Sequence, residues 1–317
     1  MTDTQNEVFK TPVNKIRLFE HGAPGSQNLK LTRKYYTEDM PDGRVKHIVQ
    51  NITDSDIVPY IPDGIGNSTD RQRIPAVLII PGGAFRRLVY NFEGEDVAKW
   101  LNSMGIAAFV LECRLPSDEH DNAEDVPLID AMRAMRVIRG RAQEFGIDEA
   151  KIGVMGFSAG GFMAALLSTA YESDVYADYK YKDEYDKLSA RPDFAVCSYP
   201  VISIDDCIEA GKRYMSEEQV LERISDGKAK ILHKYNPDKL VRPDMPPVFI
   251  CETDDDRTTL SENSVGFYMA ARKAGVSAEL HIFRTGGHGY GCGDDFAQTG
   301  EWKVLFTKWI KSIGIIS

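Results

Sequence analysis

The sequence has few cysteines, and none of them stands in a metal-binding or redox-active spacing. Five are spread over 317 residues without a C-x-x-C pair: Cys113, Cys197, Cys207, Cys251 and Cys292. This pattern predicts neither a disulfide framework nor a zinc site, and it favours a reducing compartment, the cytoplasm. We therefore expect the protein to work without a metal ion and without another cofactor.

Three further features are missing, and each excludes a class of partner or location. No apolar run approaches the length of a membrane-spanning helix. The first residues, MTDTQNEVFK, are polar and lack the basic and apolar regions of a signal peptide. The formal net charge of −10 argues against a nucleic-acid or anionic-membrane surface. These absences also predict a cytoplasmic protein.

No linker and no internal repeat divides the chain, so we expect residues 1–317 to form one domain. From Pro75 onward, strand and helix patterns alternate, which predicts a mostly parallel central sheet flanked by helices. Within an N-terminal extension, residues 1–75, two strand-like pieces at 44–52 and 57–61 should pair as an antiparallel hairpin at a sheet edge. Residues 171–240 are a candidate insertion that caps the carboxyl edge of the sheet; a surface excursion without function fits equally well.

The stretch KIGVMGFSAGG, residues 151–161, joins a buried strand pattern to an alanine-rich helix pattern through a glycine-rich turn. In this context G-x-S-x-G is typical of a nucleophile elbow, a strained turn that presents Ser158. Such a turn needs residues with almost no side chain two positions before and after the serine, here Gly156 and Gly160. The alternative is an ordinary glycine-rich turn in which Ser158 caps the helix.

A serine hydroxyl needs a base, and the base needs a group that orients it. Both are expected at the carboxyl ends of later strands. His288 follows the last strand pattern, and an acidic run of Asp254, Asp255 and Asp256 follows the strand before it. The order Ser158, acid, His288 is the one expected of a nucleophile elbow fold. The alternatives are a loop histidine and a solvated acidic turn.

A tetrahedral oxyanion needs preorganised backbone N–H donors. Ala159, the residue after the nucleophile, would supply one. The loop PGGAF, residues 81–85, follows a buried strand, so Gly83 and Ala84 are the other candidate donors.

Three aromatic residues lie near these elements in the sequence: Phe85, Phe157 and Tyr290. They could stack against a substrate that reaches the serine. The alternative is that they pack in the wall of the site.

Together these stretches resemble the α/β-hydrolase superfamily, and within it the acetylxylan-esterase-like and hormone-sensitive-lipase-like esterases. The resemblance covers most of residues 15–317 and includes IIPGGAF, EGEDVAKWLNSMGIAAFVLECRL, KIGVMGFSAGG, RPDFAVCSYPVIS and GGHGYG. It implies Asp256 as the acid that pairs with His288. Two positions depart from the family pattern: Ala84 replaces a third glycine, and Phe162 stands where histidine is common.

The resemblance implies a serine carboxylic-ester hydrolase that acts on a small ester, such as an acetylated xylo-oligosaccharide. A peptidase of the same fold and a ligand-binding module without catalysis are the alternatives. The sequence leaves the oligomeric state open, including a homo-oligomer.

Overall fold

The computed structural model describes residues 9, 12–64, 73–213, 216, 218–219, 229–293 and 298–317. Its centre is a sheet with the strand order β1-β4-β7-β5-β8-β9-β10-β11. The strands are β1 (Ile16–Arg17), β4 (Asp56–Tyr60), β5 (Ile74–Ile80), β7 (Ala107–Glu112), β8 (Ile147–Phe157), β9 (Ala195–Ser198), β10 (Val248–Thr253) and β11 (Ala278–Phe283). From β7 to β11 all neighbours are parallel, and β4 is antiparallel to both of its neighbours.

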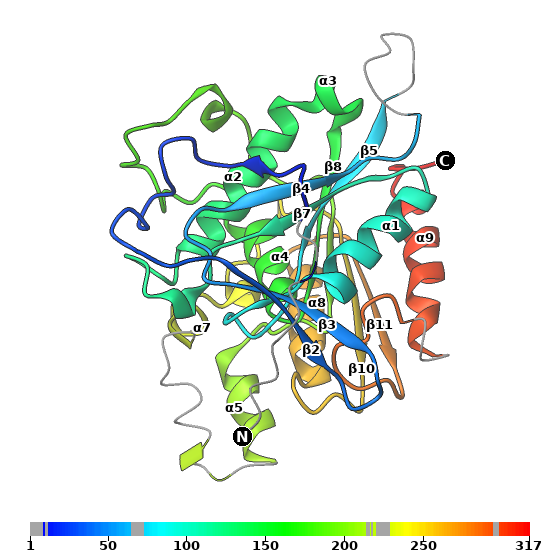
Figure 1. The fold of residues 1–317 in the computed structure, drawn as a ribbon. Helices are drawn as coiled ribbons and strands as arrows, with labels where there is room; N and C mark the ends of the chain where they lie inside the picture. Colours follow the sequence, from blue (N-terminus) through cyan, green and yellow to red (C-terminus); the bar gives the residue numbers. More distant parts are fainter. Residues whose placement is uncertain are drawn as a thin grey trace.

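Helices cover both faces of this sheet (Figure 1). On one face, α1 (Asp96–Ser103) packs against α9 (Trp302–Ser312), where the rings of Trp100 and Trp302 lie 4.9 Å apart. The other face carries α2 (Val126–Gly140), α4 (Ala159–Ala170) and α8 (Ser261–Lys273). Because helices shield them from both sides, the central strands β5 and β7 are almost wholly buried, which explains their continuous apolar sequences. The predicted layered architecture is thus confirmed.

The N-terminal strands pair differently from the expectation. Strand β3 (Val45–Gln50) belongs to a second sheet with β2 (Lys34–Asp39) and β6 (Leu88–Val89), whereas β4 joins the main sheet. The predicted hairpin of 44–52 with 57–61 is therefore wrong. Asn51 takes a left-handed φ of 56°, and the Ser55 carbonyl accepts a hydrogen bond from the N–H of Leu18, directly after β1. The chain therefore crosses from one sheet to the other between β3 and β4.

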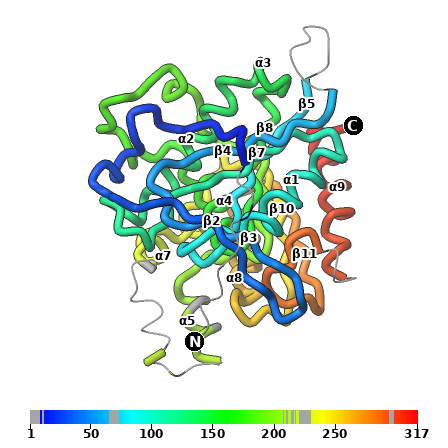
Figure 2. The backbone as a smooth tube through the Cα atoms, viewed as in Figure 1, coloured from blue at the N-terminus to red at the C-terminus, as the bar shows by residue number. Residues whose placement is uncertain are grey.

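The candidate cap falls into parts that lie in different places. Its first part, residues 171–191, lies beside α2 (Figure 2). There Arg133 forms ion pairs with Asp183 and Asp186. The later part contains α5 (Ile204–Lys212) and α7 (Ala229–Lys234). Residues 214, 215, 217 and 220–228 of the candidate cap lie outside the described residues, so a cap over the sheet edge stays a prediction.

Among the helices that the structure describes, none is long and apolar enough to cross a membrane.

Candidate active site

The turn between β8 and α4 holds Ser158 in a strained conformation. Its φ of 54° and ψ of −118° are disfavoured for a residue with a side chain. The surroundings enforce this geometry, because a Cβ at Gly156 would stand 1.9 Å from the Gly160 carbonyl oxygen. A Cβ at Gly160 would stand 1.9 Å from the carbonyl oxygen of Ile80. The two glycines therefore allow strand, turn and helix to pack closely enough to present the serine.

Of the three residues predicted to act together, His288 lies within hydrogen-bond distance of both others. The Ser158 Oγ atom is 2.8 Å from His288 Nε2, and His288 Nδ1 is 2.6 Å from Asp256 Oδ2. Ser158 follows β8, Asp256 follows β10 and His288 follows β11, so the parallel sheet brings all three to its carboxyl edge. The Asp256 side chain is completely buried, while the His288 side chain is 21% exposed. The histidine thus faces both its buried partner and the surface.

Asp256 is held as an ionised carboxylate by several donors. Its Oδ1 atom accepts hydrogen bonds from the backbone N–H groups of Thr258 and Thr259, and Oδ2 accepts one from the Thr259 hydroxyl. Burial opposes ionisation, but the hydrogen bond and charge of His288 and these amides outweigh it, so the pKa of Asp256 lies below its usual value. This environment suits a carboxylate that orients an imidazole.

The neighbouring aspartates contact other groups. Asp255 Oδ1 accepts the backbone N–H groups of Gly286 and Gly287, at 2.9 and 2.8 Å. The side chain of Asp254 is exposed. Of the three acids left open by the sequence, the geometry therefore places Asp256 against the histidine ring.

The predicted oxyanion loop lies directly against the serine. A Cβ at Gly82 would stand 2.9 Å from Ser158 Cβ, so a larger residue there would collide with the nucleophile. Gly83, Ala84 and Phe85 all have positive φ, at 139°, 57° and 58°. The backbone N–H groups of Arg86 and Arg87 donate to the Gly83 carbonyl and close the loop into a tight turn.

Two donors of the predicted oxyanion hole belong to this loop, Gly83 and Ala84. The third, Ala159, is the first residue of α4, whose N-terminus favours negative charge. Their role as donors stays a prediction.

Two functional candidates were missed by sequence reasoning, Glu93 and Tyr199. The buried Glu93 carboxylate accepts the Gly82 N–H at 2.8 Å and the Tyr199 hydroxyl at 2.8 Å. The Tyr199 ring also lies edge-on to the His288 ring, with centroids 5.0 Å apart. The one sequence signal for Glu93 is an acidic residue shortly after the oxyanion loop, which by itself indicates only a helix N-terminus.

The three aromatic candidates for substrate contact lie in different environments. Phe157 has no exposed surface and packs between Tyr199 and Trp302, so a sugar ring cannot reach it and its predicted stacking role is wrong. Phe157 ends β8, where consecutive residues are all buried because helices cover both faces of the sheet. Tyr290 is 5% exposed and packs against Tyr199, which favours the wall-packing alternative. Phe85 is also buried, but it borders a cavity beside the nucleophile.

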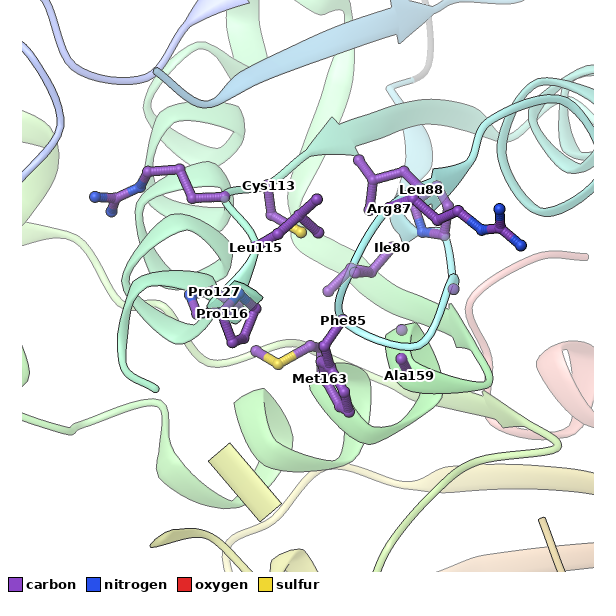
Figure 3. Close-up of a pocket in the computed structure, with 14 residues that line it drawn as sticks. Ile80, Phe85, Arg87, Leu88, Cys113, Leu115, Pro116, Pro127, Ala159 and Met163 are labelled. Atoms are coloured by element: carbon purple, nitrogen blue, oxygen red, sulfur yellow. The ribbon is translucent and has the colours of Figure 1, made fainter. Parts of the chain in front are cut away.

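That cavity lies between the oxyanion loop, the end of β7, the start of α2 and the first turns of α4 (Figure 3). Gly82, Ala159 and Gly160, which lie around the serine, line one part of the cavity. Phe85 and Met163 form part of its apolar wall. Its volume of about 10 Å³ is room for about one water molecule or one methyl group.

One wall of this cavity is supported by Phe162. Its ring meets the Phe85 ring edge-on, with centroids 5.5 Å apart. The residue that departs from the family pattern thus supports the oxyanion loop through an apolar contact.

Among the described residues, no three His, Cys, Asp or Glu side chains lie close enough together to hold a metal ion.

The sequence and the fold are both similar to those of known proteins. The model of the family described as BD-FAE matches residues 64–270. The acetylxylan esterase of Xylanibacter ruminicola is 31% identical over 240 residues, covering 75% of this chain and 45% of that protein. Endo-1,4-beta-xylanase B of Butyrivibrio fibrisolvens is 29% identical over 269 residues, 82% of this chain and 40% of that protein. The chain thus spans less than half the length of both curated relatives.

Solved structures extend the similarity to nearly the whole chain. An acetyl ester-xyloside bifunctional hydrolase from Caldicellulosiruptor lactoaceticus is 34% identical, with a TM-score of 0.68 over 96% of this chain and 97% of that one. A carboxylesterase from Lactobacillus plantarum is 20% identical, with a TM-score of 0.67 over 90% of this chain and 99% of that one, a likeness of fold. The predicted α/β-hydrolase fold is confirmed.

Proposed function

Because the chain belongs to the BD-FAE family, we propose that it is a serine carboxylic-ester hydrolase that acts through Ser158, His288 and Asp256. One observation carries the proposal: the serine hydroxyl, the imidazole and the buried carboxylate form a continuous hydrogen-bonded series at 2.8 and 2.6 Å. Such a series is the arrangement that activates a serine hydroxyl at neutral pH.

The reaction begins with attack of Ser158 Oγ on the ester carbonyl carbon, while His288 Nε2 takes the hydroxyl proton. Asp256 accepts the hydrogen bond from Nδ1–H and stabilises the imidazolium that forms. The carbonyl oxygen becomes an oxyanion, held by the backbone N–H groups of Gly83, Ala84 and Ala159. His288 then returns the proton to the departing alcohol, leaving an acyl group on the serine. A water molecule, activated by the same imidazole, hydrolyses the acyl-enzyme.

The acyl group is short, and acetyl fits best. The apolar cavity beside Gly82 and Ala159 has room for about one methyl group, the part of an acetyl ester that lies beyond its carbonyl carbon. The proposed alcohol part of the substrate is a carbohydrate, by analogy with the acetylxylan esterase and the acetyl ester-xyloside hydrolase that the chain resembles. Acetylated xylo-oligosaccharides are therefore the substrates to test first.

The experiment compares the wild type with Ser158→Ala on p-nitrophenyl acetate and on acetylated xylo-oligosaccharides. We expect Ser158→Ala to lower kcat by at least about 10⁴-fold. Ser168→Ala is a matched control, because Ser168 is a buried serine of α4, the helix that follows Ser158, and its hydroxyl donates to the Ala164 carbonyl within that helix. Equal rates from wild type and Ser158→Ala would refute the esterase. Cleavage of peptide substrates but not esters would favour a peptidase, and ligand binding without turnover would favour a binding module.

A further inference from the structure

Glu93 lies inside the protein, between the two loops that flank the proposed nucleophile. It belongs to a π-helical turn, Asn91–Glu95, that precedes α1, and it is 5% exposed. A carboxyl group in such a position must be satisfied by hydrogen bonds, or its burial costs more than it contributes. Both of its oxygens are bonded, and each bond leads to a different loop of the site.

The first bond leads to the oxyanion loop. Glu93 Oε2 accepts the N–H of Gly82 at 2.8 Å, and Gly82 immediately precedes the proposed donor Gly83. The fit is tight, because a Cβ on Gly82 would stand 2.8 Å from this same oxygen and 2.9 Å from Ser158 Cβ. Gly82 is thus held between the carboxylate and the serine, and a movement of Glu93 would shift the loop relative to the nucleophile.

The second bond leads to the histidine loop. Glu93 Oε1 accepts the Tyr199 hydroxyl at 2.8 Å, and the same hydroxyl oxygen accepts the Gly291 N–H at 3.1 Å. Gly291 lies three residues after His288. The Tyr199 ring also packs edge-on against the imidazole, at 5.0 Å. One carboxylate therefore reaches the histidine loop through a single buried tyrosine.

From these contacts we propose that Glu93 is a positioning residue that fixes the oxyanion loop and the His288 loop relative to Ser158. This inference rests on the proposed esterase function and assigns to that reaction a residue that touches none of the reacting atoms. Its role is to hold Gly82 so that the Gly83 and Ala84 N–H groups point at the place where the oxyanion forms. Preorganised donors of this kind owe their effect to being fixed before the reaction begins.

The proposal predicts which kinetic constant changes when Glu93 is replaced. Glu93→Leu keeps a similar volume but removes both hydrogen bonds, so the Gly82 N–H and the Tyr199 hydroxyl each lose their acceptor. Glu93→Gln keeps one acceptor oxygen and one donor, so it restores part of the network. Because the oxyanion exists only during the reaction, the loss should fall on kcat and leave KM nearly unchanged.

The experiment measures kcat and KM on p-nitrophenyl acetate for wild type, Glu93→Leu, Glu93→Gln and Tyr199→Phe. A second readout is the rate of covalent inactivation by diethyl p-nitrophenyl phosphate, whose phosphoryl oxygen uses the same donors. We expect Glu93→Leu to lower kcat and the inactivation rate by about 100-fold or more, the effect of losing one oxyanion donor. Glu93→Gln and Tyr199→Phe should lie between this variant and wild type, with KM changed less than about threefold.

Glu112→Gln is the matched control. Glu112 is a buried glutamate that also accepts a tyrosine hydroxyl, from Tyr35 at 2.9 Å, but its network joins β7 to the N-terminal strands. Melting temperatures of all variants separate lost stability from lost catalysis. If Glu93→Leu, like Glu112→Gln, changes the melting temperature but keeps wild-type kcat and inactivation rate, the positioning role is overturned. That result leaves the esterase standing, whereas a wild type no faster than Ser158→Ala refutes the proposed function itself.

Discussion

Asp255 and Asp256 are adjacent in the sequence, yet each holds a different part of the segment that carries His288. Asp255 Oδ1 accepts the backbone N–H groups of Gly286 and Gly287, while Asp256 Oδ2 lies 2.6 Å from the imidazole Nδ1. The first carboxylate therefore fixes the backbone that leads to the histidine, and the second orients its ring.

Exchanging these two carboxylates for neutral groups should have unequal effects. Asp256→Asn should lower kcat on p-nitrophenyl acetate by about 10⁴-fold, because the ring loses the partner that fixes its tautomer and stabilises its charged form. Asp255→Ala removes only a loop contact, so we expect a loss of about tenfold or less. Steady-state kinetics of both variants test this, and equal losses would show that Asp256 has no special role.

Gly160 cannot carry a side chain without moving the strand that leads to the oxyanion loop. In Gly160→Ala the new Cβ would stand 1.9 Å from the Ile80 carbonyl oxygen and 2.8 Å from that of Pro81. We expect a destabilisation of about 1–3 kcal/mol from this overpacking. Because Gly82 and Gly83 follow directly, we also expect kcat/KM to fall about 100-fold. Urea unfolding and ester hydrolysis measure the two effects.

At Gly266, in contrast to Gly160, there is room for a side chain. It lies in the middle of α8, without a positive φ, and nothing stands within 4 Å of the position that a Cβ would take there. Gly266→Ala should therefore stabilise the protein by about 1 kcal/mol, since alanine favours the helix, and leave the kinetics unchanged. A destabilised Gly266→Ala, or a Gly160→Ala variant with wild-type kinetics, would contradict the packing described for these two glycines.

His120 should make the protein less stable in mild acid. It is buried, its Nδ1 lies 3.0 Å from the Ser26 hydroxyl, and burial together with the nearby Arg114 lowers its pKa from 6.5 to about 4. Between these values the unfolded chain binds a proton that the folded chain does not. Stability therefore falls as pH drops from 6.5 towards 4, by up to about 3 kcal/mol, and this loss stops changing below pH 4.

The measurement is urea unfolding at pH 7.5 and pH 4.5 for wild type and His120→Asn. We expect the wild type to lose about 2–3 kcal/mol more than His120→Asn between these pH values. Asp118, whose pKa burial raises to about 6, acts in the opposite direction, but it is common to both proteins and cancels in the comparison. His233→Asn, at an exposed position, should behave like wild type. Parallel losses in wild type and His120→Asn would contradict the prediction.

Met163 should limit the length of the acyl chain. It forms part of the apolar wall of the cavity beside Ala159, which has room for about one methyl group. Met163→Ala should raise kcat/KM for p-nitrophenyl butyrate relative to the acetate by about tenfold, the usual effect of accommodating extra methylene groups. Because Met163 is buried, the variant should also lose about 2–5 kcal/mol of stability.

Met135→Ala is the control for this substitution. Met135 is equally buried in α2 but does not border the cavity, so it should lose stability without changing the acyl preference. An unchanged butyrate-to-acetate ratio in a folded Met163→Ala protein would mean that the acyl group lies elsewhere.

Local sequence was enough to predict where chemically active side chains would gather. Ser158, Asp256 and His288 each lie in a loop or turn shortly after a strand, and parallel strands end at one edge, so their meeting follows from the pattern of strands alone. Asp256 could be distinguished from Asp255 only by resemblance, because neighbouring residues in one turn differ in direction, and direction depends on φ and ψ.

Features that depend on contacts between residues far apart in the sequence could not be predicted in this way. The separation of β3 from β4 is decided by which strands lie beside them in space, namely β2 and β6 for one and β1 and β7 for the other. Glu93 shows the same limit: its partners Gly82 and Tyr199 are 11 and 106 residues away. The prediction for Phe157 was wrong because proximity to Ser158 in the sequence says nothing about which face of β8 it occupies.

The backbone at residue 158 also restricts which nucleophile this scaffold can carry. Threonine offers the same hydroxyl group, but its branched Cβ is poorly compatible with a φ of 54° and a ψ of −118°. An unbranched cysteine meets no such obstacle. A search for altered chemistry on this framework should therefore start from a thiol. The added methyl group of threonine would force residue 158 out of the turn conformation that exposes the reactive atom.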